Sequence, residues 1–316
     1  YNRSQQVVGK NVADCLSPIS SVYWNKYRER FMIAGVSCLD YLMLYKNFTF
    51  SSKPSYRLDE IGKSEVGTAK ISYDGTLNDL YENHLNDFVK YNIHDVRIVK
   101  KLDDKLDFID VARGICHVGH VPYEDIVYDS RFLEGAILVY LKKLGVVSPN
   151  KPPRDDVKKD GKFTGAYVQD PQKGRHDWVY DLDITSMYPS IIMSLNVSPE
   201  TKIGKIEGWN PQEFIKGKNK TYSVHMNGKK KGQLTEVELK DFFDKNQVSI
   251  SDNGIIYRTD KQGLIPTLLS DWFDKRKEYR KLAKKFGDAG DEDQYGYFNR
   301  RQHIQKIVLN SMYGVL

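Results

Sequence analysis

The clearest pattern of apolar and polar positions lies between Trp178 and Thr185. There the apolar residues Trp178, Tyr180, Leu182 and Ile184 alternate with Val179, Asp181, Asp183 and Thr185. A period of two is typical of a strand with one apolar face, and it places Asp181 and Asp183 together on the other face. Pro189 then suits the first turn of a helix, where its missing N–H would have no partner anyway. The pattern predicts a strand ending in carboxylates, followed by a helix whose free N–H groups can bind an anion.

Apolar residues follow helical spacing from Leu77 to Phe108, which predicts a helix there. Tyr91 and Asp95 are four residues apart on this helix, so they share a face. Taken alone, such a pair is typical of a surface contact between a tyrosine and a carboxylate.

Residues 266–313 show helical spacing again. Pro266 opens a helix, Gly287–Gly290 predicts a tight turn, and a second helix runs on to Tyr313. The first helix carries a basic stripe of residues at intervals of four: Arg276, Arg280 and Lys284. The second helix is predicted to gather five polar or aromatic residues on one side: Asn299, His303, Lys306, Asn310 and Tyr313.

Between these helical regions, Ser148–Asp160 is rich in proline and charge and predicts a linker, and residues 201–260 predict short strands and turns. The length of 316 residues suffices for two or three domains. A net charge of +6 permits nucleic-acid binding without requiring it. The basic runs at 216–220 and 228–232 fit either solvated turns or phosphate contacts.

Other features exclude classes of protein. The three cysteines are widely spaced, which indicates reduced thiols rather than a disulfide scaffold. Cys116, His117 and His120 lie close together, but no fourth ligand is near them, which argues against a structural metal cluster. No stretch is long and apolar enough to span a bilayer, so we expect no membrane partner.

The chemistry of the first segment has two interpretations. Asp181 and Asp183 fit a solvated strand end, and they fit equally a metal site beside an anion-binding turn. A divalent ion on Asp183 at such a turn would suit a nucleoside triphosphate. The residue pattern alone leaves both interpretations open.

Two specific motifs now favour the second interpretation. Asp183–Ser190 (DITSMYPS) resembles the first polymerase motif of family B DNA polymerases, D-x-x-S-L-Y-P-S, with Met in place of Leu. Far downstream, Lys306–Gly314 (KIVLNSMYG) resembles the K-x-x-x-N-S-x-Y-G motif of that family. Residues 35–41 and 54–56 most resemble the T-even phage replicative polymerases. The family's chains are much longer, so we expect a piece of such a protein: an expressed part, a truncated gene or one subunit of a split enzyme.

The resemblance implies an α+β, multidomain fold. It comprises part of an RNase H-like 3′→5′ exonuclease domain, a partial palm with a mixed or antiparallel sheet, and fingers formed by a helical hairpin. The expected division is 1–147 for the C-terminal part of the exonuclease domain with connecting helices, 148–165 for a linker, 166–265 for the palm with the first polymerase motif and an insertion, and 266–316 for the fingers.

The resemblance also implies roles in nucleotidyl transfer with two Mg²⁺ ions. Asp183 is the expected catalytic carboxylate and metal ligand, with the backbone carbonyl of Ile184 as a second ligand, and Lys306 is expected to protonate the leaving pyrophosphate. The implied nucleotide-binding residues are Ser186, Met187, Tyr188, Arg276, Arg280, Lys306 and Asn310. The implied DNA-binding residues are Gly165, Ala166, Tyr313 and Gly314; Phe163, just before the first two, stands where the family has Tyr.

For the exonuclease, Tyr91 and Asp95 resemble the family's third motif, Y-x-x-x-D. Its Asp holds a metal ion and its Tyr orients the attacking water. No D-x-E sequence occurs in residues 1–90, so the resemblance covers only part of this site.

The expected function is DNA-templated DNA synthesis from dNTPs at a primer 3′-hydroxyl, with proofreading in the full-length enzyme. The expected partners are primer–template DNA, dNTPs, a sliding clamp and a second polypeptide with the D-T-D motif and thumb, in the cytoplasm of an infected bacterial host. Because residues 1–316 contain no D-T-D sequence, the isolated chain is expected to be inactive. The alternative is a non-catalytic DNA-binding module that keeps the polymerase fold.

Overall fold

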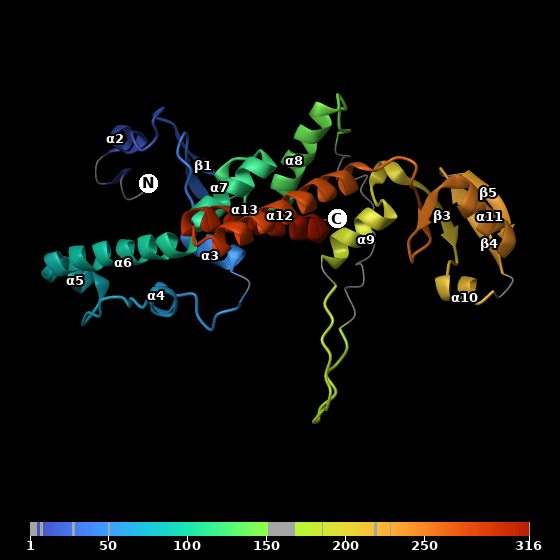
Figure 1. Cartoon of the computed structure of the whole chain (residues 1–316). Coiled ribbons are helices and arrows are strands. Elements are labelled where there is room, and N and C mark those ends of the chain that lie inside the picture. The colour runs from blue at the N-terminus through green and yellow to red at the C-terminus, as the bar shows by residue number, and fades with distance from the viewer. Residues whose placement is uncertain are drawn as a thin grey trace. The chain divides into compact units, whose positions relative to one another are not determined.

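The computed structural model of the chain describes residues 5–6, 9–26, 29–49, 51–150, 168–184, 186–217, 220–227 and 229–315. The chain divides into two compact units. Unit 1 consists of Tyr1–Ile137 and Trp272–Leu316, and unit 2 consists of Leu138–Asp271. The division falls within two helices, α8 (Asp129–Lys143) and α12 (Leu264–Asp288) (Figure 1).

Unit 1 is mainly helical. Its described elements besides α8 and α12 are α2 (Lys10–Asp14), β1 (Val22–Asn25), β2 (Arg30–Ile33), α3 (Tyr41–Phe48), α4 (Leu58–Val66), α5 (Leu77–Asn83), α6 (Leu85–Leu106), α7 (Phe108–Gly119), η1 (Tyr123–Asp125) and α13 (Glu292–Val315). The strands β1 and β2 form an antiparallel pair.

The centre of unit 1 is the packing of α7 against α3 and α13. The ring of Phe108 lies 5.8–6.2 Å from the rings of Tyr41, Tyr45 and Phe48. On the α13 side, a Cβ at Gly114 would overlap the buried side chain of Ile304. The absence of a side chain at position 114 therefore allows α13 to approach α7 closely.

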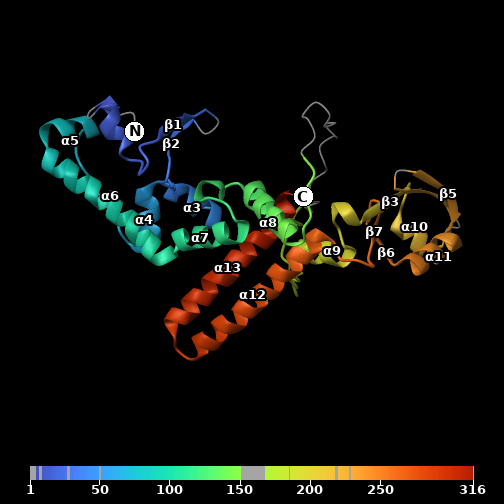
Figure 2. The same ribbon diagram turned by 90° about the horizontal axis from the view of Figure 1, so that it is seen from above.

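The helices α12 and α13 form a hairpin and lie side by side in both views of the ribbon (Figures 1 and 2). Phe298 joins them, because its ring stacks on Phe286 at 5.5 Å and lies 6.3 Å from that of Tyr279. Gly290 adopts a φ of +73° in the turn, a conformation that glycine adopts without strain. The predicted pair of helices and its turn are confirmed, with α12 beginning two residues before Pro266.

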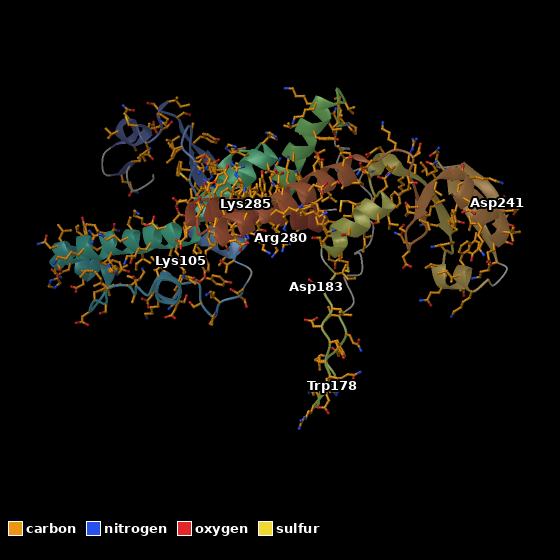
Figure 3. All side chains as sticks on the ribbon, in the orientation of Figure 1. Lys105, Trp178, Asp183, Asp241, Arg280 and Lys285 are labelled. Atoms are coloured by element: carbon orange, nitrogen blue, oxygen red, sulfur yellow. The ribbon has the colours of Figure 1, made fainter. Side chains whose placement is uncertain are left out.

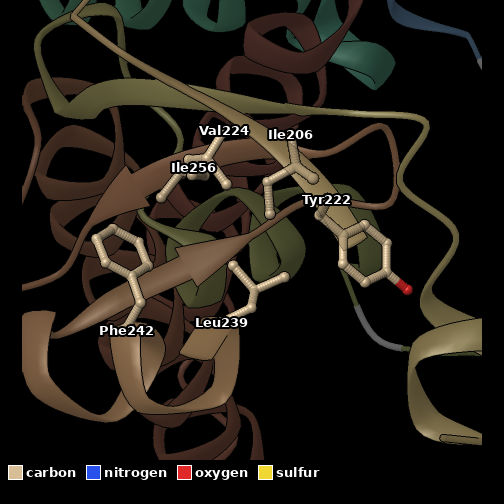
Figure 4. Packing of buried hydrophobic residues seen from close by; sticks show 6 residues of the cluster. All are labelled: Ile206, Tyr222, Val224, Leu239, Phe242 and Ile256. Carbon is tan, nitrogen blue, oxygen red and sulfur yellow. The ribbon is translucent and has the colours of Figure 1, made fainter. Parts of the chain in front are cut away.

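The core of unit 2 is a five-stranded antiparallel sheet in the order β5-β4-β3-β7-β6. One apolar cluster joins the sheet to α11: Ile206, Tyr222, Val224, Leu239, Phe242 and Ile256 (Figure 4). The predicted short strands are confirmed. The described elements are α9 (Met187–Leu195), η3 (Pro199–Thr201), β3 (Lys202–Glu207), α10 (Pro211–Ile215), β4 (Thr221–Met226), β5 (Lys229–Thr235), α11 (Glu236–Asn246), β6 (Val248–Ile250) and β7 (Ile255–Arg258).

The strand predicted between Trp178 and Thr185 is wrong for the part of it that the structure describes. Residues 178–184 are irregular, and Figure 3 shows Trp178 and Asp183 along this segment. The would-be apolar face is exposed, with Leu182 at 92% and Trp178 at 87% of full accessibility. The alternation specifies which side chains share a face, but a strand also needs a partner for its backbone groups. No described strand pairs with this segment.

The helix predicted from Leu77 to Phe108 exists but is divided. It breaks at His84, between α5 and α6, and again at Asp107, whose backbone is left-handed with a φ of +55°. Aspartate tolerates this conformation better than most residues do. Tyr91 and Asp95 both lie on α6.

A buried asparagine ties α9 to the start of α12 within unit 2. Asn196 ends α9 in a left-handed conformation. Its side-chain Nδ2 donates to the carbonyl oxygens of Arg258 at 2.6 Å and Lys261 at 2.9 Å, and its Oδ1 accepts from the N–H of Gly263 at 2.8 Å. Glu200 adds a carboxylate that accepts from the N–H of Leu264, the first residue of α12. The end of α9 and the start of α12 are therefore fixed to one another.

We predict that Asn196→Ala destabilises this joint. The substitution leaves three backbone groups without their side-chain partner, the N–H of buried Gly263 and two partly buried carbonyls, at a cost of about 1–3 kcal/mol for each group that water does not reach. Hydrogen exchange at the Gly263 N–H should accelerate, and urea unfolding should shift to lower concentration. The matched control is Ser194→Ala on the exposed side of α9. Unchanged exchange at Gly263 would contradict the prediction.

Candidate functional site

Basic side chains of α12 and α13 form a cluster in unit 1, here called the cationic cluster: Arg276, Arg280, His303 and Lys306. Arg276 and Arg280 are one turn apart on α12, while His303 and Lys306 are three residues apart on α13. The pKa of Arg276 is lowered by burial and by the charge of Arg280. The pKa of His303 is lowered by burial and by the charges of Lys306 and Arg276. Arg276 and His303 therefore act on one another across the two helices, and Arg280 and Lys306 each add a positive charge beside one of them.

The cationic cluster is suited to an anion. Among the residues that the structure describes, no carboxylate contributes to the pKa shift of Arg276 or His303. The Nε of Arg276 is buried and has no hydrogen-bond partner in the part of the chain that the structure describes. A buried donor without a partner is costly, and an oxyanion would satisfy it. Guanidinium groups bind phosphate oxygens in pairs, so an oligophosphate fits this cluster.

In unit 2, the N-terminus of α9 is a second anion-binding feature. Ser186 precedes the helix in a left-handed conformation with a φ of +52°, and its side chain makes no capping bond. Pro189 is buried in the first turn, as predicted. Asp183, Ile184, Met187 and Tyr188 are exposed to solvent to different degrees. The N–H groups at the start of α9 are thus not capped by the Ser186 side chain, and the expected metal ligand Asp183 lies in the irregular segment before it.

A lysine joins the predicted pair on α6. The ammonium of Lys70 donates to Tyr91 Oη at 2.9 Å and to Asp95 Oδ2 at 2.6 Å, and it lies 5.1 Å from the centre of the Tyr91 ring. Burial would lower the pKa of Lys70, but the hydrogen bonds to Asp95 and Tyr91 outweigh burial and raise it. Tyr91 and Asp95 share a face as predicted, and Lys70 is a third member that the sequence analysis missed. It precedes Tyr91 by 21 residues, outside any helical spacing.

The described residues do not make a complete magnesium site. Nowhere in the described ranges do three histidine, cysteine, aspartate or glutamate side chains gather as metal ligands. Asp95 binds Lys70 through one oxygen, while its Oδ1 is buried and has no hydrogen-bond partner among the residues that the structure describes. Asp183 provides one exposed carboxylate. A Mg²⁺ ion needs near-octahedral oxygen coordination, so either aspartate would require further ligands.

The family of the chain follows from its similarity to known proteins. The sequence profile of DNA polymerase family B matches residues 128–316, more than half of the chain. The chain belongs to DNA polymerase family B. The matched range contains α9 and the whole α12–α13 hairpin, whereas Lys70, Tyr91 and Asp95 precede it.

Family B relatives with similar sequences include the DNA-directed DNA polymerases of Escherichia phage RB69 and Enterobacteria phage T4. The chain is 30% identical to the first over 291 residues and 31% identical to the second over 286 residues. Each alignment covers 89% of this chain and 29% of the relative. The predicted resemblance to T-even phage polymerases is confirmed, and the chain spans less than a third of the length of these relatives.

The fold agrees with that of a solved family member. The family B DNA polymerase of the archaeon Pyrobaculum calidifontis superposes with a TM-score of 0.61 at 20% sequence identity. The match covers 94% of this chain and 35% of that one. The predicted α+β class is confirmed by this match and by the mixture of helices and antiparallel sheet.

The remaining predicted site residues of this family B chain stay predictions. Gly165 and Ala166, with Phe163, lie outside the described residues. Tyr313 and Gly314 lie exposed in the last turn of α13. Asn310 is exposed at a cavity of about 210 Å³ that α13 forms with α3, α7 and α8 in unit 1. None of the helices in the described ranges has the length and apolar character needed to cross a bilayer.

His303 is a member of the cationic cluster to which the sequence analysis gave no role. We predict that it makes the chain acid-sensitive, because its pKa in the folded chain lies below the ordinary value of 6.5. The unfolded chain then binds the proton more readily. The stability from neutral His303 is present above about pH 6.5 and is lost as pH falls through that value toward the folded pKa. His303→Gln should therefore reduce the pH dependence of the free energy of unfolding.

The measurement is urea unfolding of wild type and variant between about pH 7.5 and 5. His117→Gln, at an exposed position of α7, is the control. Equal pH dependence of wild type and His303→Gln would show that the histidine is not held neutral by its neighbours.

Proposed function

We propose that this chain forms the exonuclease-to-fingers part of a DNA-directed DNA polymerase, which extends a primer 3′-hydroxyl with dNTPs. The observation that carries the proposal is the cationic cluster, because it lies on the hairpin whose second helix holds the Lys306–Gly314 motif of a family B chain. In this proposal Arg276 and Arg280 hold the phosphates of the incoming nucleotide. Lys306 contacts the triphosphate and protonates the pyrophosphate as it leaves.

The α9 segment has a complementary role in the proposal. The N–H groups at Ser186 and Met187 donate hydrogen bonds to phosphate oxygens, because helix N-termini favour anions. Tyr188 lies under the deoxyribose. Asp183, with the carbonyl of Ile184, contributes to binding a catalytic metal ion. Family B polymerases generally depend on divalent metal ions, and such ions neutralise the charge that develops in phosphoryl transfer. Further carboxylates are required to complete that site, so residues 1–316 alone do not suffice.

Lys70, Tyr91 and Asp95 support a second proposed activity, 3′→5′ exonuclease proofreading. Tyr91 would orient the attacking water, and Asp95 would bind a metal ion through Oδ1, which has no hydrogen-bond partner in the described part of the chain. The ammonium of Lys70 holds both side chains in place and neutralises one negative charge at the site. Nuclease chemistry by two metal ions needs more carboxylates than Asp95, so this site also requires residues that these three do not supply.

We predict that Arg276→Ala weakens binding of a dNTP to the chain. Charge-assisted contacts to phosphate contribute about 1.5–3 kcal/mol each, which corresponds to roughly 10- to 150-fold in affinity. Calorimetric titration with dATP measures the loss. Lys277→Ala is the matched control, because Lys277 is the next residue on α12, is exposed and pairs with Asp274. Equal affinities of wild type and Arg276→Ala for dATP would show that Arg276, in the basic stripe of α12, does not contact the nucleotide.

The chain as it stands should bind primer–template DNA with an affinity that falls as salt rises, and should neither extend nor degrade it. Adding a polypeptide that carries the D-T-D motif and thumb should restore extension. Asp183→Ala should abolish the restored activity, whereas Asp181→Ala should largely retain it. Gel-based primer extension measures both.

Two outcomes would count against this proposal. Extension by residues 1–316 alone, with contaminating polymerase excluded, would show that the catalytic carboxylates are complete. DNA binding without any restored extension would favour the non-catalytic DNA-binding module.

A further inference from the structure

A second charged cavity lies on another face of the hairpin, and the proposed polymerase function does not use it. It has a volume of about 580 Å³ and is lined by α7, α12 and α13, all within unit 1. Lys275 and Tyr279 of α12 face it, whereas Arg276 and Arg280 do not line it. One residue along a helix turns the side chain by about 100°, so the two sets of basic residues face different directions.

The charges around this cavity do not cancel. Four full cations line it, Arg113, Arg300, Arg301 and Lys275, together with two carboxylates, Asp107 and Asp110. The carboxylates are already engaged. Arg300 Nη1 donates to Asp107 at 2.8 Å, and Arg300 Nε lies 3.4 Å from Asp110, which also pairs with Arg113.

Lys275 and Arg301 remain available to a ligand. Neither makes an ion pair with a carboxylate of the described residues, although Arg301 lies over the Tyr297 ring at 4.6 Å. Two uncompensated cations match a phosphate monoester, which carries about −1.5 to −2 charges near pH 7. Tyr279 and Tyr297 line the same cavity. Aromatic walls beside cations are how proteins commonly hold a base next to its phosphate.

A buried amide supplies an independent sign of a missing ligand. Gln305 is only 5% exposed and lines the cavity, and its Oε1 has no hydrogen-bond partner within the described ranges. A buried acceptor left unpaired is costly, so the site lacks a donor. An amino group on a nucleobase is such a donor, and glutamine amides pair well with base edges.

We propose that this cavity binds a nucleoside 5′-monophosphate, either free or as the phosphorylated end of a DNA strand. Lys275 and Arg301 hold the phosphate, the tyrosines flank the base, and Gln305 accepts from its amino group. The cavity volume lies within the roughly 300–1,000 Å³ typical of small-molecule sites. The ligand would bridge α7 to both helices of the hairpin.

The test is calorimetric titration of the full chain with dAMP. Lys275→Ala and Gln305→Leu should each weaken binding by about tenfold or more. Lys277→Ala should leave it unchanged, because that residue does not line the cavity. Arg276→Ala should also leave dAMP binding unchanged. That variant separates this site from the cationic cluster, so failure of the proposed dNTP site and failure of this one are distinguishable. Lys275 is exposed, which makes its variant a test that does not depend on repacking the interior.

Competition experiments then identify the source of the ligand. Displacement of dAMP by a 5′-phosphorylated oligonucleotide, but not by the same strand without the phosphate, assigns the site to strand ends. No displacement by either strand assigns it to the free nucleotide. Inorganic phosphate or deoxyribose 5-phosphate binding as tightly as dAMP would overturn the proposal, since the base would then contribute nothing. Absence of dAMP binding at about 5 mM, or affinity unchanged in both Lys275→Ala and Gln305→Leu, would overturn it as well.

Discussion

Apolar packing in unit 1 holds the basic side chains of the cationic cluster close together, and the proposed binding of phosphate depends on this packing. Arg276, His303 and Lys306 act on one another unfavourably, as the lowered pKa values of the first two show. Two unit charges 4 Å apart repel by about 1 kcal/mol in water and by more in a protein. Against this, burying one large apolar side chain contributes about 1.5–3 kcal/mol. The stack of Phe286 on Phe298 and the contact of Ile304 at Gly114 fix the helices before any anion arrives.

The α6 site handles charge in the opposite way. Asp95 lies beside an ammonium from the same chain, so its negative charge is compensated without a metal ion. At the cationic cluster, no carboxylate of the described residues shifts the pKa of Arg276 or His303. One site therefore pairs a carboxylate with a cation of the same chain, while the other brings basic side chains close to one another. This difference follows from which residues the packing brings together, not from the overall charge of +6.

The sequence predicted the helices well and the isolated strand poorly, for a physical reason. Helical hydrogen bonds are local, so spacing and turn residues between 266 and 313 suffice to predict a hairpin. A strand needs a partner, and the alternation from Trp178 onward contains no information about one. The same distinction applies to the sites. Tyr91 and Asp95 were predictable from an interval of four, whereas Lys70 reaches them only through the packing of α4 against α6. Gln305 belongs to no motif, and it is noticeable only because its buried Oε1 has no hydrogen-bond partner within the described residues.

The discontinuity of unit 1 has a consequence for the order of folding. Its two segments are separated by residues 138–271, which make up unit 2. At about 5–20 residues per second, the ribosome needs on the order of ten seconds to make that stretch. During that time α7 exposes the surface that α13 later covers, including the notch at Gly114. Unit 2 can meanwhile complete its sheet and, through Asn196 and Glu200, fix the first turn of α12. Unit 2 then fixes the start of α12, the helix that leads into the second segment of unit 1. Although the first segment of unit 1 is made before unit 2, unit 1 can therefore complete its folding after unit 2.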